Sequence, residues 1–324
     1  MSAYERSERR LALRPDPAPP VVAAWGMGVD STAMIIEWVA RRRPLDLVLT
    51  ADTGSERPET YEFLPVFQRW MDRMGIEHHV VRYMPKRFKN WPPYYTLIEN
   101  CLTNGTMPSI SFGRNHTCSL KWKIEPQNKF VQSWEPALRS WASGSKVIKL
   151  IGYDCSPADN RRYAEREGHI DERYDYQYPL REWLWDRDDC IRRIRREGLP
   201  VPHKSACIMC CAARPAEIRT LPAWCLRLII LIEARAKPRL RTVDGLWRKP
   251  TKGLRGREAR PGSMTEFIRA EGLLPANDID DIIASAPADL LRFQDAAALV
   301  PIEERAPLRD WLDRFNAGIE RIAA

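Results

Sequence analysis

The segment of residues 21–36, with the sequence VVAAWGMGVDSTAMII, constrains the fold more than any other part of the chain. Its apolar residues 21–25 predict a buried strand, a turn with Gly26 and Gly28 follows, and an apolar stretch from Asp30 onward predicts a helix. A strand, a glycine turn and a helix N-terminus in succession can form an anion site, because free backbone N–H groups and the positive end of the helix dipole point at one spot. The alternative is an ordinary strand–helix turn in which Asp30 caps the helix.

We call residues 26–32 the glycine loop. In this loop, Gly28 would let the backbone approach an anion, and the hydroxyls of Ser31 and Thr32 would add hydrogen-bond donors. The loop is not the common P-loop, because no Gly-Lys-Ser/Thr follows at the required spacing. It is also not the dinucleotide-binding fingerprint, which needs a third glycine. The residues therefore predict a phosphate site of another kind.

Strand and helix patterns alternate along the chain after the glycine loop. Apolar runs and their boundary residues predict strands at 45–49, 76–82 and 147–151, and helices at 58–74 and 188–197. This alternation predicts an α/β fold with a doubly wound parallel sheet. Asp52 and Thr53 follow one predicted strand, and Gly152 follows another. Parallel sheets bind ligands at the carboxyl ends of their strands, so these residues are candidate binding residues.

The expected domain plan has three parts. Residues 1–20 form a disordered leader, residues 21–220 a nucleotide-binding domain, and residues 221–324 a helical C-terminal addition. The helices expected in that addition are residues 224–236, 264–271, 278–284 and 307–322. Within the first domain, residues 84–117 are long, irregular and rich in Pro, Asn and aromatic side chains. A segment of this kind is either functional or disordered, and we expect a lid that faces the substrate.

The composition indicates a cytoplasmic protein that binds no membrane. No apolar run approaches the roughly 20 residues of a membrane span, and the charged, proline-rich N-terminus is unlike a signal peptide. The formal net charge is +8. A basic face suits a phosphorylated ligand or a nucleic acid, although solvated surface charge is the ordinary explanation.

The chain has 8 cysteines. In a cytosolic protein, this number argues against a disulfide framework and for metal or redox chemistry. Cys207, Cys210 and Cys211 form a cluster, and Cys118 lies in a polar segment. The other cysteines are scattered, and the ordinary explanation for a scattered cysteine is a small buried apolar residue.

Four motifs, in the same order along the chain, resemble those of the phosphoadenosine phosphosulfate (PAPS) reductase family. The glycine loop is similar to the pyrophosphate loop, Ser-Gly-Gly-x-Asp-Ser, of the adenine nucleotide alpha hydrolase superfamily, with Gly26 and Met27 in place of the first two residues. The other matches are ADTG at 51–54 followed by Glu59-Thr60, Cys118 followed by KIEP at 123–126, and YPL at 178–180 followed by GLPVP at 198–202 and Cys207-x-x-Cys210. The resemblance implies an adenine nucleotide alpha hydrolase-like sheet over residues 21–220 that binds ATP or PAPS.

Two departures from the family pattern change the implied activity. Cys118 is followed by Ser119, where cluster-containing reductases have a cysteine pair, and no cysteine follows Cys225. The resemblance therefore implies an ATP pyrophosphatase or adenylating sulfurtransferase that acts on a nucleic acid or a small acceptor, with a sulfur donor such as a cysteine desulfurase. Two alternatives stay open. One is a thiol-dependent PAPS or adenylyl sulfate reductase, and the other is a non-catalytic protein that binds nucleic acid.

The resemblance also implies roles for individual side chains. The glycine loop, with Asp30, would hold the pyrophosphate, and Asp52 would hold Mg²⁺ or orient the ribose. Lys123, Arg161 and Arg162 would neutralise phosphate charge, or else are ordinary surface charges. Cys118, Cys207 and Cys210 would bind one metal centre, with Cys211 or Cys190 as the fourth ligand. Such a site suits a 4Fe-4S cluster or zinc, and thiols that pack or pass sulfur as persulfides are the alternative.

Overall fold

A computed structural model describes residues 18–286 apart from 87–89, 91–92, 109–116 and 254–257. The described residues form two compact units. The first unit comprises those of Met1–Asp52, Glu56–Arg82 and Ile124–Ser205, and the second comprises those of Thr53–Ser55, Tyr83–Lys123 and Ala206–Ala324. The second unit therefore starts before residue 221 and includes much of the segment 84–117. Most of the expected leader and the expected helix 307–322 lie outside the described residues.

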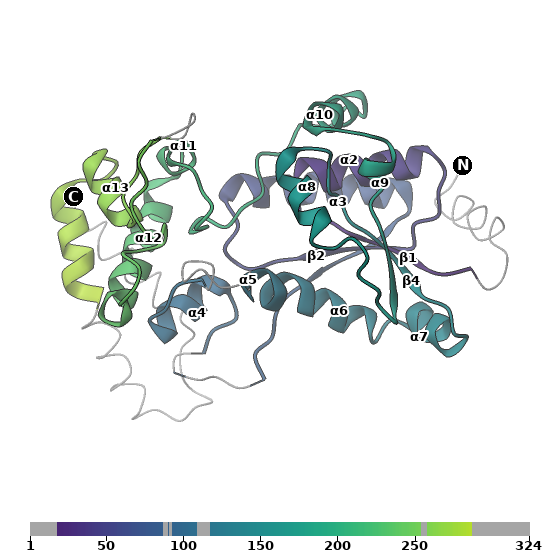
Figure 1. The fold of residues 1–324 in the computed structure, drawn as a ribbon, viewed down its shortest axis with the longest axis horizontal. Helices are drawn as coiled ribbons and strands as arrows, with labels where there is room; N and C mark the ends of the chain where they lie inside the picture. Colours follow the sequence, from purple (N-terminus) through teal and green to yellow (C-terminus); the bar gives the residue numbers. More distant parts are fainter. Residues whose placement is uncertain (1–17, 87–89, 91–92, 109–116, 254–257, 287–324) are drawn as a thin grey trace. The chain divides into compact units, whose positions relative to one another are not determined.

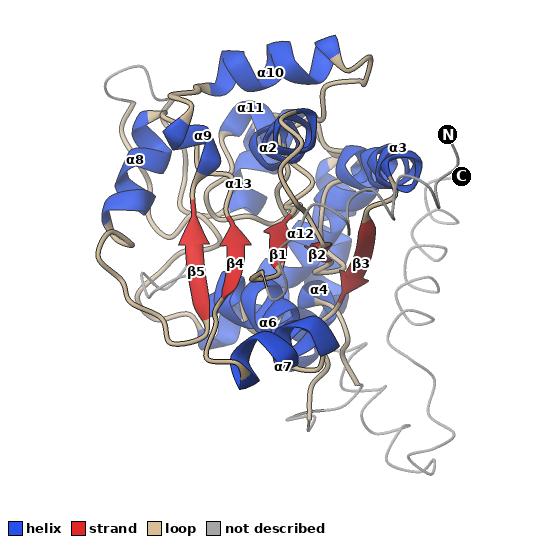
Figure 2. Ribbon diagram, turned by 90° about the vertical axis from the view of Figure 1, so that its right-hand side faces the viewer, coloured by secondary structure: helices blue, strands red, loops and turns tan. Residues whose placement is uncertain are grey.

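The first unit is built on a five-stranded parallel sheet (Figure 1, Figure 2). Its strands are β1 (Val21–Ala24), β2 (Leu47–Ala51), β3 (Glu77–Val81), β4 (Val147–Leu150) and β5 (Tyr174–Gln177). Their order across the sheet is β3-β2-β1-β4-β5, and β1 pairs with both β2 and β4. The chain thus builds the sheet outward from β1 in one direction and then, from β4, in the other. The predicted doubly wound parallel sheet is confirmed, and its topological switch point lies between β1 and β4.

Helices cover both faces of this sheet (Figure 2). One face is covered by α2 (Val29–Ala40), α3 (Pro58–Met74), α9 (Pro179–Glu182) and α10 (Arg187–Arg196), and the other by α6 (Glu125–Val131) and α7 (Glu135–Ala142). Alternation along β4 divides its side chains between the two cores. Ile148 and Leu150 pack with the core beneath α2 and α3, whereas Val147 packs with the core that faces α6 and α7. The helix α8 (Pro157–Ala164) follows β4.

The helix α3 has the predicted bounds because both of its ends are encoded locally. Pro58 occupies the first turn, where its missing N–H costs nothing, and Gly75 ends the helix with a φ of 67°. Phe63, Phe67 and Trp70 line one face of the helix, and the Phe67 and Trp70 rings stack with centroids 4.9 Å apart. This aromatic row packs against the core formed by α2 and β1.

The edge strand β5 was not predicted. Its residues Tyr174-Asp175-Tyr176-Gln177 are polar or amphipathic, so they lack the apolar run by which the inner strands were identified. Backbone pairing with β4 defines this strand instead, with Val147 opposite Tyr174.

The second unit is helical. Its elements are α4 (Leu97–Asn104), α5 (Thr117–Ser119), α11 (Pro215–Arg219), α12 (Ala223–Ala236), the short 3-10 helix η3 (Lys237–Arg239), α13 (Met264–Ala270) and a helical stretch over 276–286, and a π-helix η2 (Leu120–Ile124) leads out of it. The predicted helices 224–236, 264–271 and 278–284 are thus present. The segment 84–117 is not irregular throughout as expected, because it contains α4, and its role as a lid stays a prediction. Thr96 and Glu99 form a capping box at the start of α4, and Leu97, Ile98 and Leu102 are buried in the core of this unit.

Glu233 on α12 organises the chain that follows. Its buried carboxylate accepts hydrogen bonds from the backbone N–H groups of Leu246, Met264 and Thr265 and from the hydroxyl of Ser263. The same carboxylate lies 2.3 Å from the position of a Cβ at Gly245, so only glycine fits there. One side chain therefore joins α12 to the start of α13.

Across the part of the chain that the structure describes, every helix is too short or too polar to cross a membrane.

Candidate functional site

The glycine loop connects the carboxyl end of β1 to α2, as predicted. The helix begins at Val29 and its N-cap is Gly28, so Asp30 lies in the first turn and does not cap the helix as the alternative interpretation had it. Gly28 has a φ of −103°, which any residue can adopt, and a Cβ built there would make only an ordinary contact, 3.5 Å from Cβ of Ser205. The first-turn N–H groups of α2 thus have no capping side chain before them, which suits an anion.

Met27 adopts a strained conformation beside this N-cap. Its φ is +58°, a left-handed value that favours glycine, and the pyrophosphate loop that this segment resembles has glycine here. The side chain of Met27 is buried, with 2% exposed, in the core formed with Trp25 and Phe63. Burial of a methionine stabilises by roughly 1.5–3 kcal/mol, enough to offset a backbone strain of about 1–2 kcal/mol.

The two hydroxyls of the glycine loop have different surroundings. The buried Thr32 hydroxyl donates to the Gly28 carbonyl at 2.7 Å and accepts from the Trp25 indole at 2.9 Å, so it holds the loop together. The half-buried Ser31 hydroxyl accepts from the Gly26 N–H at 3.2 Å and lies 3.4 Å from the Gly28 carbonyl. These longer contacts leave Ser31 the better candidate to donate to a ligand.

Gly152 joins the loop after β4 to the glycine loop at the switch point of the sheet. A Cβ at Gly152 would lie 2.8 Å from Cα and 2.9 Å from N of Ser31, so the two backbones touch and only glycine fits. Ser205 contacts the loop from another direction, since its hydroxyl donates to the Gly26 carbonyl at 2.5 Å. Nothing in the local sequence around Ser205 indicated this contact across 179 residues.

Asp30 lies in a mixed electrostatic environment. Its Oδ2 accepts a hydrogen bond from Arg187 of α10 at 2.8 Å, while its buried Oδ1 has no hydrogen-bond partner among the described residues. Burial raises the pKa of Asp30 to about 6, Arg187 opposes this shift, and the negative charges of Asp154 and Asp159 add to it. A second cation near Oδ1 would be favourable in such a site.

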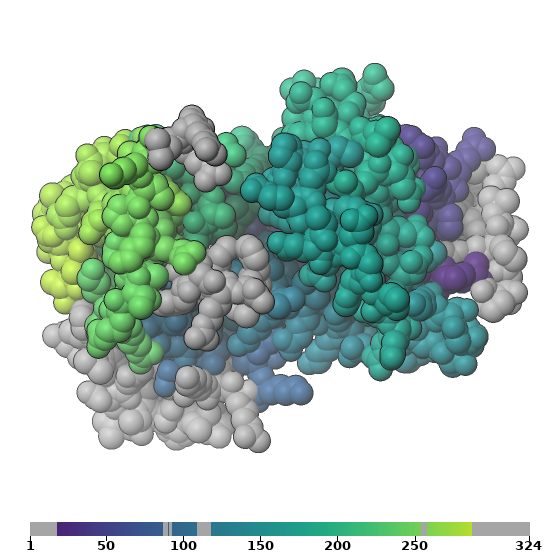
Figure 3. Space-filling view, viewed as in Figure 1, coloured from purple at the N-terminus to yellow at the C-terminus, as the bar shows by residue number. Residues whose placement is uncertain are grey.

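Arg187 was missed by the sequence analysis, whereas Arg161 and Arg162 were predicted. Both predicted arginines are exposed on α8, and Arg162 pairs with Asp159 at 3.0 Å. Figure 3 shows α8 and α10 in teal at the surface of the first unit. Arg187, through its pairing with Asp30, is the arginine that the structure places at the glycine loop.

Asp52 is placed at the end of β2, as predicted, but its carboxylate is occupied by protein partners. It is 4% exposed, accepts from the Tyr61 hydroxyl at 2.7 Å, and accepts two hydrogen bonds from Arg82 at 2.6 and 2.9 Å. Burial and the Asp52 charge raise the pKa of Tyr61, so the phenol stays a donor. Any ribose or Mg²⁺ bound by Asp52 would have to compete with these contacts.

Thr53 and Lys123 belong to the second unit, so their predicted roles beside the glycine loop remain predictions. The Thr53 carbonyl accepts from the N–H of Leu97, and its hydroxyl lies 3.6 Å from the sulfur of Cys207. Lys123 is half-buried in the π-helix η2.

All 8 cysteines lie in the described part of the chain, and none of them forms a disulfide. Six of them contribute to the core of the second unit or pack against it: Cys101, Cys118, Cys207, Cys210, Cys211 and Cys225. Cys101 is scattered in the sequence, but in the fold it lies near Cys211 and Cys118. Burial raises the pKa of Cys101, and these two thiols add to the shift. Cys190, one of the two candidate fourth ligands, is instead buried in the core of the first unit, where burial raises its pKa.

The predicted metal ligands Cys118, Cys207 and Cys210 therefore share one core. Among the described residues, however, no group of three or more His, Cys, Asp or Glu side chains is arranged to hold a metal ion. The structure thus brings these soft donors into one core.

Comparison with known proteins gives likenesses of fold. No protein-family model matches the chain, and no curated protein matches it. Among solved structures, a phosphoadenylyl-sulfate (PAPS) reductase from Candida auris, in a phosphate complex, is similar over 62% of this chain and 82% of its own, with 16% identity and a TM-score of 0.36. The U34-tRNA thiolase NcsA from Methanococcus maripaludis, with its [4Fe-4S] cluster, is similar over 63% of this chain and 67% of its own, with 16% identity and a TM-score of 0.35.

Proposed function

We propose that the first unit binds ATP with its pyrophosphate on the N-terminus of α2, and that the enzyme transfers the adenylyl group to an acceptor. The contact between Gly152 and Ser31 is the single observation that best supports this proposal. It joins the loops after β1 and β4 at the switch point, where doubly wound sheets bind their ligands. It also leaves the bare N-cap Gly28 beside the Ser31 hydroxyl.

The proposed reaction places most of its demand on charge stabilisation. An oxygen of the acceptor attacks the α-phosphorus, the bond between this phosphorus and the bridging oxygen breaks, and pyrophosphate leaves with the bonding electrons. The N–H groups of α2 and the Ser31 hydroxyl would bind the leaving group, and Arg187 would add a guanidinium fork if it turned from Asp30 to the phosphates. The acceptor is then activated, because AMP is a good leaving group.

Mg²⁺ suits this site because Asp30 offers a buried carboxylate oxygen without a hydrogen-bond partner among the described residues. A bound Mg²⁺ would neutralise phosphate charge. Asp30 would hold the ion, and Asp154 and Asp159 would add to the negative potential around it.

Sulfur transfer is the proposed second half of the reaction. A sulfur nucleophile, written here as hydrosulfide from a donor protein, attacks the activated carbon of the acceptor, and AMP leaves with the former acceptor oxygen. The core thiols of the second unit are candidate sulfur carriers when the donor protein holds a cysteine persulfide instead of hydrosulfide. A thiolate of this chain then attacks the outer sulfur, and the donor's cysteine thiolate leaves. The new persulfide attacks the activated carbon as AMP leaves, and a second thiolate releases the thiolated acceptor by forming a disulfide, which an external dithiol reduces. The described thiols are not arranged as a metal site, so no step of this proposal uses an iron–sulfur cluster.

Reduction of PAPS to sulfite is less well supported by the residues present. Cys118 has no adjacent cysteine, and the chain after Cys225 has none. In the described fold, burial raises the pKa of both Cys101 and Cys190, which makes them poor thiolate nucleophiles.

The test is a pair of anaerobic assays on the full chain. ATP-dependent release of pyrophosphate, with AMP as the other product, is expected in the presence of an acceptor mixture of RNA and DNA. Rapid thioredoxin-dependent sulfite formation from PAPS, without pyrophosphate release from ATP, would contradict the proposal and support the reductase. Binding of nucleic acid with a steep salt dependence and neither activity would support the non-catalytic alternative.

A further inference from the structure

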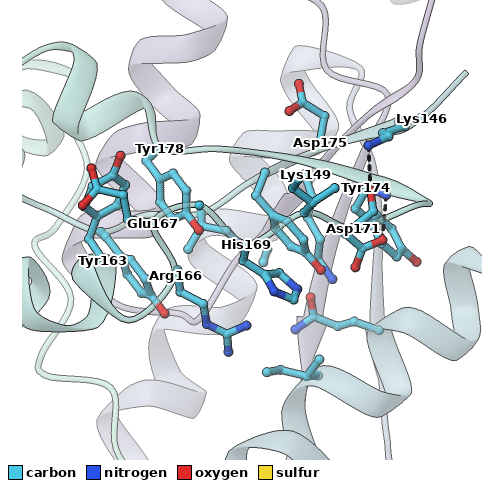
Figure 4. Close-up of a pocket in the computed structure, with 18 residues that line it drawn as sticks. Lys146, Lys149, Tyr163, Arg166, Glu167, His169, Asp171, Tyr174, Asp175 and Tyr178 are labelled. Carbon is cyan, nitrogen blue, oxygen red and sulfur yellow. Dashed lines mark hydrogen bonds between the residues drawn. The ribbon is translucent and has the colours of Figure 1, made fainter.

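A cavity of about 410 Å³ lies in the first unit (Figure 4). Its wall includes Lys149 of β4 and Tyr174 of β5, together with Gln127 of α6. Lys149 alternates with Ile148 and Leu150, which pack in the core beneath α2, so its side chain enters the α6 side of the sheet. This volume is within the range of small-molecule sites.

The wall of the cavity holds a buried ammonium and two buried polar atoms that have no hydrogen-bond partner among the described residues. Lys149 is 4% exposed, and its ammonium donates to Oδ1 of Asn128 at 2.8 Å. The hydroxyl of Tyr174 and Oε1 of Gln127 are buried, and neither has a hydrogen-bond partner among the described residues. Unsatisfied buried polar atoms are costly, so two of them beside a buried ammonium favour a ligand that supplies the missing partners.

Aromatic rings and cations line the rest of the cavity. The rings of Tyr153 and Tyr178 are stacked with centroids 5.6 Å apart, and Tyr163 meets Tyr178 edge-on at 5.0 Å. Figure 4 shows Arg166 and His169 beside these rings, in the space between Tyr178 and Lys149. A flat aromatic ligand with an attached anion matches such a wall.

We infer that this cavity binds a nucleotide whose base presents a ring N–H next to a carbonyl, as uracil and guanine do. The carbonyl would accept from Lys149 and from the Tyr174 hydroxyl, and the ring N–H would donate to Gln127. Adenine and cytosine lack this pair of groups. The phosphate would lie near Arg166. The nucleotide comes from one of two sources, a free mononucleotide or an unstacked position of a single strand.

This site is distinct from the glycine loop and adjacent to it. Ile151 and Tyr153, which line the cavity, flank Gly152, the residue that touches Ser31. A base in the cavity would therefore lie next to the loop at which ATP is proposed to bind. That this base is the acceptor of the adenylyl group rests on the proposed function. That a nucleotide binds in the cavity does not.

The test is calorimetric titration of the full chain with UMP, GMP, CMP, AMP and a single-stranded decamer of uridylate, without ATP. UMP and GMP are expected to bind at least about tenfold more tightly than CMP and AMP, the discrimination expected from one or two hydrogen bonds. Comparable affinity for UMP and the decamer would identify a free nucleotide as the ligand, and a much tighter decamer would identify a single strand. Equal affinity for all four mononucleotides, or no binding of any probe, would overturn the inference.

Tyr174→Phe is the most informative variant, because the hydroxyl that it removes has no hydrogen-bond partner in the described part of the chain. Its thermal stability is expected to equal or exceed that of the wild type, while UMP binding weakens about tenfold. Tyr83→Phe removes a tyrosine hydroxyl from the second unit and should leave UMP binding unchanged. Unchanged UMP binding in Tyr174→Phe would contradict the inference.

Titration with inorganic pyrophosphate separates this inference from the proposed function. Pyrophosphate binding is expected to persist in Tyr174→Phe and to be lost in Gly28→Val, whereas UMP binding should show the reverse pattern. If Gly28→Val bound pyrophosphate as the wild type does while UMP behaved as expected, ATP binding at the glycine loop would be refuted and the nucleotide cavity would stay supported. If Tyr174→Phe bound UMP as the wild type does while pyrophosphate behaved as expected, the cavity would be refuted and the glycine loop would stay supported.

Discussion

Two glycine-to-alanine substitutions, Gly28→Ala in the glycine loop and Gly152→Ala in the loop after β4, should differ in their effect on stability, although both add one methyl group. In Gly152→Ala, the new Cβ would lie 2.8 Å from Cα and 2.9 Å from N of Ser31. Non-bonded carbons prefer about 3.5–4.0 Å, so one backbone segment must move by roughly 0.7 Å or more. In Gly28→Ala, the new Cβ would lie 3.5 Å from Cβ of Ser205, which is an ordinary contact.

These distances set the expected magnitudes. Overpacking of a tight contact costs about 1–3 kcal/mol, and the reduced entropy of the unfolded chain returns about 0.4–1 kcal/mol. Gly152→Ala should therefore lower the free energy of unfolding by about 1–2 kcal/mol. Gly28→Ala should change it by less than about 0.5 kcal/mol, because a small loss at the N-cap offsets the same entropy term.

Urea unfolding and pyrophosphate titration together distinguish the two sites. Both variants should bind pyrophosphate more weakly than the wild type, Gly152→Ala because the N-terminus of α2 is displaced and Gly28→Ala because a methyl group obstructs the anion. A stable Gly152→Ala protein with wild-type affinity would show that the two loops do not touch as described. Wild-type affinity in Gly28→Ala would show that the anion does not approach the N-cap.

Three further perturbations test other parts of the structure. Burial lowers the pKa of Lys149 from 10.5 to about 8, with Asp171 opposing the shift. Between these pH values the unfolded chain holds a proton that the folded protein has lost, so the free energy of unfolding should rise with pH by up to about 3 kcal/mol. In Lys149→Met, urea unfolding at pH 7 and pH 10 should give the same free energy of unfolding. At pH 7 the variant should be about 1–2 kcal/mol more stable than the wild type, because the cost of the buried charge exceeds the lost hydrogen bond to Asn128. Identical pH dependence in both proteins would refute a buried charged amine. The pKa of Asp30 is raised from 3.8 to about 6, so the folded protein holds the extra proton between these values and its stability should fall as pH rises from 4 to 6. Without Mg²⁺, the negative charge of Asp30 should also weaken pyrophosphate binding above pH 6. Asp30→Asn should therefore bind pyrophosphate more tightly than the wild type at pH 7. Weaker binding by this variant would show that the carboxylate helps to hold the anion. Finally, Glu233→Ala leaves four donors without their acceptor. It should therefore lower the free energy of unfolding by about 3–5 kcal/mol. A loss below about 1 kcal/mol would contradict the role of Glu233 in joining α12 to α13.

The parts of the fold that could be predicted from the sequence are those encoded by neighbouring residues. The strand β1, the turn at Gly26 and Gly28, and the helix α2 follow each other within 20 residues. Pro58 and Gly75 mark both ends of α3. The strand β5 was missed because its pairing with β4, rather than an apolar run, makes it a strand. The helix α4 was missed because it lies within a segment rich in Pro, Asn and aromatic residues.

At the candidate site, the sequence predicted the residues that local pattern places there, but not the partners that the fold brings to them. Local pattern identified the glycine loop, and the place of Gly152 after a predicted strand made it a candidate binding residue. Arg187 and Ser205 reach the loop from far along the chain, and no local pattern could pair them with it. The same reason applies to Asp52, whose bonds to Tyr61 and Arg82 depend on how β2, α3 and the end of β3 come together. Cys101 joins Cys118 and Cys211 only because α4 folds into the core of the second unit.

Binding of pyrophosphate at the N-terminus of α2 is the central claim, and it can be measured directly. The measurement is calorimetric titration of inorganic pyrophosphate, with Mg²⁺, into the wild type and Gly28→Val, with urea unfolding of both proteins. The wild type should bind, and Gly28→Val should bind at least about tenfold more weakly while it unfolds at nearly the same urea concentration. Equal affinity in two equally stable proteins would contradict the claim, because the bulky side chain would then stand where the anion was proposed to lie.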